Sequence, residues 1–253
     1  MQKIITDRLE SILGVKKTPS SREKELFQKT QNFIRSIHWI PGLRMVAVSN
    51  SLAMYATHSE SDIDLFIITA VNRLWIVRTS VLIIAMLRGV RTKPGDEAGK
   101  FCFPFFMTEQ HLSLEKIAIE NDVYLAYWIR SLKPVYDIDT TYDRFMETNR
   151  TFCETILHLT PSDEEYTSLR EKNKIFLPIA QTHVWRERIE SLLSPVLSLK
   201  NNLLGYISRK IIKRNMIAFS ADGLVVDDDM VKIHTHDRRS DIRSACLSGY
   251  VSQ

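Results

Sequence analysis

Cysteine is scarce in this chain of 253 residues. The three cysteines, Cys102, Cys153 and Cys246, lie far apart and follow neither a Cys-x-x-Cys nor a Cys/His ligand spacing. The sequence therefore suggests neither a disulfide framework nor a zinc site. Glycine and proline are also sparse, with eight of each, which argues against a fibrous repeat or a disordered tract. A reducing compartment such as the cytosol fits this composition.

No apolar run is long enough to cross a bilayer. The most apolar segment, residues 74–90, is interrupted by Arg78 and Arg88. Its unbroken part, residues 79–87, is about half of the ~20 residues that a membrane-spanning helix needs. Residues 1–17 contain no uninterrupted apolar stretch of the signal-peptide kind. We therefore expect a cytoplasmic protein with no membrane partner, in which the apolar segment forms a buried helix.

A strong net charge is absent as well. The chain has 34 basic and 30 acidic side chains, which gives a formal net charge of +4. This balance permits contact with nucleotides, but a dedicated nucleic-acid-binding domain is usually much more basic, so nucleic acid is only a weakly supported partner. The sequence also contains no Gly-x-x-x-x-Gly-Lys-[Ser/Thr] loop and no Gly-x-Gly-x-x-Gly element, so P-loop and dinucleotide-binding sites have no support.

Apolar periodicity predicts helices and strands in alternation over the first part of the chain. Helices are expected at residues 3–14, 21–38, 73–89 and 113–132, and strands at residues 43–48, 63–69, 101–107 and 135–136. Pro104 cannot donate a hydrogen bond within a sheet, so an edge position or a bulge is expected there. The chain is long enough for two cores, and we predict an α/β domain at residues 1–140 and a mostly helical accessory domain at residues 141–253.

The second part carries no motif that identifies a ligand. A long helix is predicted at residues 196–219, where basic and apolar side chains alternate. It is interpreted as an amphipathic helix with a solvated basic face, with a face that contacts phosphate or RNA as the alternative. Two histidines near its end, His234 and His236, precede Asp237. Their spacing is better explained by a surface loop than by a metal site.

Two carboxylates, Asp62 and Asp64, stand at the start of the second predicted strand. Alternate residues of a strand point to the same side, so both carboxylates are expected to project from one face of the sheet. Two negative charges this close repel each other unless a cation lies between them, and carboxylate oxygens are ligands that suit Mg²⁺. The pair therefore predicts a divalent-metal site.

A fixed spacing connects this pair to the preceding strand. Asn50 and Ser51 follow the strand at residues 43–48, and ten residues separate them from Asp62-Ile63-Asp64. This arrangement resembles the signature of the DNA polymerase β-like nucleotidyltransferase superfamily. The segment SLAMYATHSESDIDLFIIT is most similar to the small bacterial and archaeal members, which include aminoglycoside nucleotidyltransferases and minimal nucleotidyltransferase antitoxins. The resemblance implies an α/β (α+β) fold, in which a small mixed sheet flanked by helices precedes a mostly helical domain.

The resemblance also implies an activity. It is the transfer of NMP from an NTP to a hydroxyl acceptor, which would be a small molecule, a protein side chain or an RNA end, with Mg²⁺ or Mn²⁺ as the cofactor. Asp62 and Asp64 would be the catalytic, metal-binding residues. Nucleotide binding is expected from four residues: Asn50, Ser51, Ser61 and Lys100.

The chain departs from the family pattern in two places. Asn50 stands where glycine is usual, although asparagine tolerates the positive φ that such a turn often needs. Many members also carry a third acidic residue on the adjacent strand, whereas residues 101–107 contain no carboxylate. Glu109 or Asp137 would have to substitute for it. The alternative function is therefore a catalytically degenerate nucleotidyltransferase-fold protein that binds nucleotides or a partner.

Overall fold

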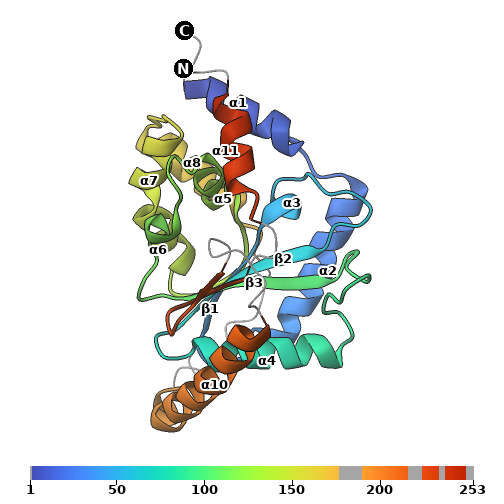
Figure 1. Cartoon of the computed structure of the whole chain (residues 1–253), viewed down its shortest axis with the longest axis vertical. Helices are drawn as coiled ribbons and strands as arrows, with labels where there is room; N and C mark the ends of the chain where they lie inside the picture. Colours follow the sequence, from blue (N-terminus) through green and yellow to red (C-terminus); the bar gives the residue numbers. More distant parts are fainter. Residues whose placement is uncertain (1, 177–189, 216–223, 234–236, 249–253) are drawn as a thin grey trace.

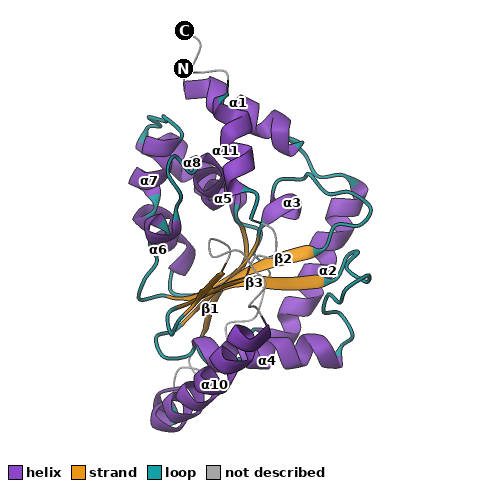
Figure 2. Ribbon diagram, viewed as in Figure 1, coloured by secondary structure: helices purple, strands orange, loops and turns teal. Residues whose placement is uncertain are grey.

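One mixed sheet of six strands, with helices around it, forms the centre of the molecule (Figures 1 and 2). The computed structural model describes residues 2–176, 190–215, 224–233 and 237–248. The strands are β1 (Leu43–Val48), β2 (Ile63–Thr69), β3 (Phe101–Thr108), β4 (Lys133–Asp137), β5 (Leu224–Val226) and β6 (Met230–Ile233), in the order β4-β1-β2-β3-β6-β5. Strands β2 and β3 are parallel, and the other neighbours are antiparallel. The prediction of an α/β chain with a mixed sheet and flanking helices is confirmed.

The helices vary from short turns to a rod of six turns. They are α1 (Gln2–Leu13), α2 (Ser21–Ile37), α3 (Asn50–Ala53), α4 (Leu74–Leu87), η1 (Glu115–Ile117, a 3₁₀ turn), α5 (Val123–Ser131), α6 (Thr141–Thr148), α7 (Arg150–Ile156), α8 (Asp163–Asn173), α10 (Ser194–Asn215) and α11 (Arg239–Leu247). Within the described ranges, no helix has the length and apolar character that crossing a membrane requires. The predicted end of the long helix at residues 216–219, and also His234 and His236, fall outside these ranges.

Local signals predicted most elements of the first part of the chain, but one predicted helix there is wrong, and β5 and β6 lie in the part predicted to be mostly helical. Strands β1 and β2 have the predicted bounds. Strand β3 has a bulge beside Pro104: Asp64 pairs with Cys102 and Phe66 pairs with Phe105, so a step of two residues along β2 is matched by a step of three along β3. The single helix predicted at residues 113–132 is wrong: η1 and α5 take its place. The chain breaks at Asn121, whose φ is +50°. Asp122 then caps α5 by accepting a hydrogen bond from the Leu125 amide at 2.9 Å.

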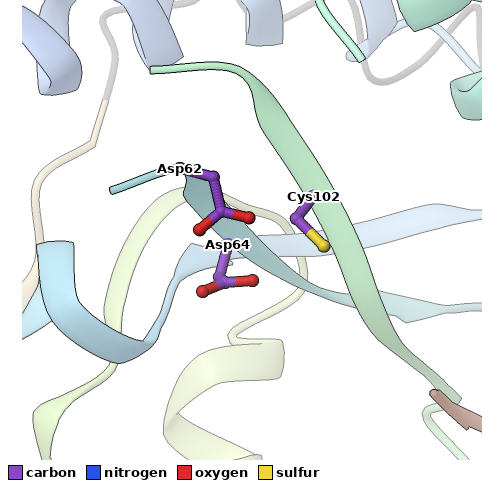
Figure 3. A group of neighbouring side chains, drawn as sticks. All are labelled: Asp62, Asp64 and Cys102. Atoms are coloured by element: carbon purple, nitrogen blue, oxygen red, sulfur yellow. The ribbon is translucent and has the colours of Figure 1, made fainter. Parts of the chain in front are cut away.

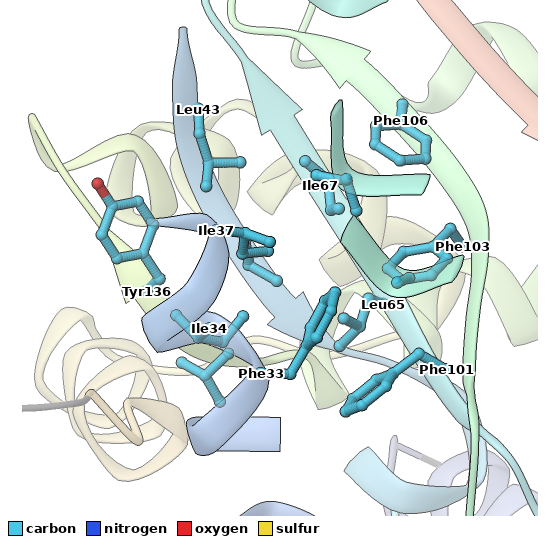
Figure 4. Close-up of a cluster of buried hydrophobic side chains, with 14 of the residues drawn as sticks. Phe33, Ile34, Ile37, Leu43, Leu65, Ile67, Phe101, Phe103, Phe106 and Tyr136 are labelled. Atoms are coloured by element: carbon cyan, nitrogen blue, oxygen red, sulfur yellow. The ribbon is translucent and has the colours of Figure 1, made fainter. Parts of the chain in front are cut away.

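Alternation along β2 divides the core into two layers. Leu65 and Ile67 face α2 and α4, in a buried cluster that includes the stacked rings of Phe33 and Phe101 (Figure 4). Phe66 and the residues on its side of the sheet face the opposite layer, which contains α1, α5, α6, α7, α8 and α11. Since Asp64 is two residues before Phe66, its side chain emerges on this second side.

Segments on both sides of residue 140 share this sheet and its core. The ring of Phe66 lies 5.3 Å from that of Phe145 on α6, and strands β5 and β6 extend the sheet beyond β3. Helix α10 packs against α4. The division into domains at 1–140 and 141–253 stays a prediction, and any boundary there would cross a continuous hydrophobic core.

Glu23 joins the start of α2 to the loop before β2. Its side chain is fully buried and accepts hydrogen bonds from the Ser20 amide at 2.7 Å and from the Thr57 amide and hydroxyl at 3.2 and 3.0 Å. Lys16 Nζ lies 2.9 Å away. Burial alone would raise the pKa of Glu23, but these hydrogen bonds outweigh it and lower the pKa from 4.5 to about 2. The ionised carboxylate therefore stabilises the fold.

Replacement of Glu23 by glutamine is expected to lower the free energy of unfolding at pH 7 by about 3 kcal/mol, since each unit of pKa difference between folded and unfolded chains is worth about 1.4 kcal/mol. Because the folded pKa is depressed, this contribution is complete above pH 4.5 and disappears as the pH falls toward 2. Urea unfolding of the wild type and Glu23→Gln at several pH values measures it. The exposed neighbour Glu25→Gln is the control, and a wild type–variant difference that persists undiminished at low pH would contradict the assignment.

Candidate functional site

The loop from β1 to β2 builds one wall of the site. The Ser49 amide donates a hydrogen bond to the Asp64 carbonyl at 3.0 Å, which ties the start of the loop to its end. Asn50 follows with a φ of +52° and opens the short helix α3. This left-handed conformation is one that asparagine adopts more readily than other non-glycine residues. The turn therefore forms with asparagine, rather than glycine, at position 50.

Asp62, Asp64 and Cys102 form a compact cluster at the start of β2 and β3 (Figure 3). One ligand atom from each of the three lies within 4.8 Å of the others, and each side chain is partly exposed. Asp64 pairs directly with Cys102 in the parallel register of β2 and β3, so their side chains emerge on the same face. The two carboxylates converge as the sequence predicted, and the thiol is an addition that the cysteine spacing did not reveal.

The electrostatics of this cluster favour a bound cation. Burial raises the pKa of Asp62. Burial, and then the charge of Asp62, raise the pKa of Asp64 to about 7, despite a hydrogen bond from Asn50. Burial also raises the pKa of the Cys102 thiol, and the two carboxylates add to the effect. Ionisation of both carboxylates therefore has a free-energy cost, which a divalent cation bound between them would remove.

The side chain of Asn50 links this cluster to α5. Its Nδ2 donates a hydrogen bond to Asp64 Oδ2 at 2.8 Å. Its Oδ1 accepts hydrogen bonds from Trp128 Nε1 at 2.8 Å and from the Tyr124 hydroxyl at 3.4 Å. The amide thus fixes the orientation of the Asp64 carboxylate. The sequence placed both aromatic residues on a helix, but gave no sign that their polar atoms converge on Asn50.

A cavity of about 310 Å³ adjoins the cluster. Asp64, Asn50 and Ser51 line it, and Phe105 and Trp128 contribute aromatic surface. The C-terminal part of the chain contributes charged lining residues: Lys232, Asp237, Arg238 and Arg239. A mostly apolar cavity with a few convergent charged groups is the usual form of a small-molecule site.

The predicted nucleotide-binding residues are divided by the fold. Asn50 and Ser51 line the cavity. Ser61 is buried, and its hydroxyl accepts a hydrogen bond from the His58 amide at 2.9 Å. Lys100 forms an ion pair with Asp96. The contacts of Ser61 and Lys100 stabilise loops beside the cluster, and their binding of nucleotide stays a prediction.

Neither Glu109 nor Asp137, the two candidates for a third acidic residue, joins the cluster of Asp62 and Asp64. Glu109 follows the far end of β3 and accepts hydrogen bonds from Arg44 at 3.2 Å and Arg144 at 2.6 Å. Asp137 pairs with Met45, which in turn pairs with Ile68. Asp137 therefore lies level with Ile68, which is four residues after Asp64 and about 13 Å from it along β2. Among the described residues, Cys102 is the one potential metal ligand that joins the two aspartates.

The arrangement has a clear chemical capacity. Two carboxylates and a thiol would hold a divalent cation, and the neighbouring cavity offers a hydroxyl and cationic side chains to an anionic ligand. The chain matches none of the protein-family models, curated proteins or solved structures with which it was compared. A functional proposal must therefore be argued from the site itself.

Proposed function

We propose that this protein is a divalent-metal-dependent nucleotidyltransferase that transfers NMP from an NTP to a hydroxyl acceptor. The observation that carries the proposal is the convergence of Asp62 and Asp64 on one face of the sheet, beside the cavity that Ser51 lines. The likeness of Asn50-Ser51 and Asp62-Ile63-Asp64 to the nucleotidyltransferase signature supports the same conclusion. It also supports assignment of the sheet and its helices to the nucleotidyltransferase fold.

Asp62 and Asp64 would hold Mg²⁺ or Mn²⁺. Their donor atoms suit either ion, and the raised pKa of both carboxylates is the expected property of a pair that lacks a neutralising charge. When bound, such an ion neutralises charge on the phosphates and lowers the pKa of an attacking hydroxyl. Cys102 adds a softer sulfur ligand, which favours Mn²⁺ over Mg²⁺.

The protein's own side chains would position the substrate. The Asn50 amide orients the Asp64 carboxylate through its 2.8 Å hydrogen bond. Ser51 lines the cavity, where its hydroxyl would donate to a phosphate oxygen, and Arg238, which also lines the cavity, would offset the charge of the triphosphate. Trp128 gives an apolar surface suited to a base or to the acceptor.

A second candidate function is nucleotide binding without transfer. It is favoured because no third carboxylate joins Asp62 and Asp64 among the described residues; Cys102 lies beside them, and a thiol whose pKa is raised by burial is a poor general base. The side chain of Asn50 also fills part of the turn that glycine would leave open. Such a protein would bind an NTP in the same cavity, with the same metal, and release no pyrophosphate.

Pyrophosphate release from each of the four NTPs tests the proposal, with Mg²⁺ or Mn²⁺ and with cell extract as a source of acceptors. We expect release that EDTA stops and that excess Mn²⁺ restores, at a higher rate with Mn²⁺ than with Mg²⁺. Calorimetric titration with each NTP measures binding separately. Binding without release would support the second candidate, and the absence of both would overturn the two together.

A further inference from the structure

One face of helix α10 packs against α4, and the opposite face is exposed. The packed face contacts the start of α4, where Asn201 Oδ1 accepts hydrogen bonds from the Trp75 and Ile76 amides at 2.9 and 3.1 Å. One turn later Gly205 meets the Trp75 ring so closely that an added Cβ would lie 2.6 Å from a ring carbon. These contacts fix which side of α10 faces outward.

The outward face is apolar along its length. Its large apolar side chains are between 44% and 72% exposed and recur mostly at intervals of three and four residues, which places them on one side of the helix. We call them the α10 stripe: Val196, Leu199, Leu203, Tyr206, Ile207 and Ile211. A helix of this length is about 33 Å long, and a surface helix of a globular protein normally has polar side chains on its outward face.

Basic side chains are interspersed with the stripe. Lys200, Lys210 and Arg214 are exposed, and at 100° per residue they fall on the same side of the helix as Leu203. The sequence of α10 contains no aspartate or glutamate. The outward face therefore combines apolar side chains with positive charge alone.

This combination of apolar and basic side chains argues against two other binding partners, a second copy of the chain and a nucleic acid. Two copies of α10 packed face to face would place like charges against each other, and like charges across an interface oppose association. A nucleic acid would neutralise the basic residues, but its phosphate backbone would leave the leucine and isoleucine side chains without apolar contacts. An anionic lipid surface satisfies both requirements, because headgroups pair with lysine and arginine while the acyl boundary accepts apolar side chains.

We infer that α10 binds the surface of an anionic phospholipid bilayer, with the stripe inserted at the headgroup boundary. This inference departs from the sequence-based expectation of no membrane partner, which rested on the absence of a spanning segment. Helix α10 packs on the side of the sheet opposite to the Asp64 cavity. A bilayer on the stripe would thus leave the cavity accessible. The inference does not depend on nucleotidyl transfer.

Flotation of the full chain with phospholipid vesicles tests this inference. Vesicles of phosphatidylcholine alone are compared with vesicles that contain 30 mol% phosphatidylserine. We expect binding to the anionic vesicles, and at least a tenfold loss of binding in Leu199→Ser/Leu203→Ser. Lys200→Glu/Lys210→Glu should lose a similar factor, since each basic side chain near the surface contributes about fivefold. High salt should weaken wild-type binding.

Ile12→Ser on α1 and Lys24→Glu on α2 provide controls, because both positions are exposed and lie outside α10. Helices α1 and α10 lie at opposite ends of the molecule (Figure 1). Circular dichroism verifies that each variant is folded. Failure of the wild type to float with anionic vesicles would overturn the inference. So would unchanged binding in Leu199→Ser/Leu203→Ser, which would indicate a purely electrostatic contact of the kind that RNA makes. A dimer in light scattering that the same variant dissociates would also overturn it, in favour of a second copy.

Discussion

The Asp62→Asn/Asp64→Asn variant is expected to release pyrophosphate from NTPs at least about 1,000-fold more slowly than the wild type. The substitutions keep the shape of both side chains but remove the charges that would hold the cation. Metal ions contribute several kcal/mol of transition-state stabilisation, and each 1.36 kcal/mol corresponds to a factor of ten in rate. Initial rates with Mn²⁺ at saturating NTP measure the effect.

Measurement of stability shows whether this variant has lost its activity alone or has also lost its fold. Because burial and mutual repulsion raise the pKa of Asp64 from 3.8 to about 7, its ionised form destabilises the metal-free fold. This destabilisation develops as the pH rises from the unfolded pKa to the folded one and is complete above the folded pKa. The double variant should therefore unfold at an equal or higher urea concentration than the wild type at pH 8. Asp7→Asn on α1 is the control, since Asp7 is exposed and does not belong to the cluster. Wild-type rates in the double variant would refute the proposed role of the pair.

Replacement of Arg239 by methionine should lower the free energy of unfolding by 3–5 kcal/mol, the usual range for removal of one partner from a buried ion pair. The guanidinium of Arg239 lies 2.9 Å from Asp122 and 2.8 Å from Asp237, and all three side chains are at most 10% exposed. It also donates a hydrogen bond to the Ile117 carbonyl at 2.7 Å. Its removal would leave buried carboxylates without a counter-charge. Urea unfolding measures the change.

Two further variants serve as comparisons for the loss of stability in Arg239→Met. Arg243→Met removes a basic side chain from the same helix, where it donates an exposed hydrogen bond to the Glu120 carbonyl, and should change stability by no more than about 0.5 kcal/mol. Arg239→Lys keeps the charge but loses the planar fork, so an intermediate loss is expected. A loss below about 1 kcal/mol in Arg239→Met would show that this cluster contributes little to folding.

The sequence by itself determined the features that depend on neighbouring residues. The cap of α2 at Ser20 was predictable because the groups that form it are three residues apart. The same holds for the bounds of β2 and for the shared face of Asp62 and Asp64, since alternation along a strand is a local property. The error at residues 113–132 is also local in origin: apolar periodicity outweighed the capping signal of Asp122.

Only the tertiary structure decided what surrounds the two aspartates. Cys102 joins them because β3 pairs in parallel with β2 in one register. Parallel strands are joined by a long crossover rather than by a short turn, so no local turn sequence indicates which of their residues pair. Trp128 reaches Asn50 because α5 packs across the turn, and Arg239 reaches the cavity from the far end of the chain through its buried bond to Asp122. Contacts between segments so distant in sequence are selected by packing of the whole core, so no local pattern encodes them.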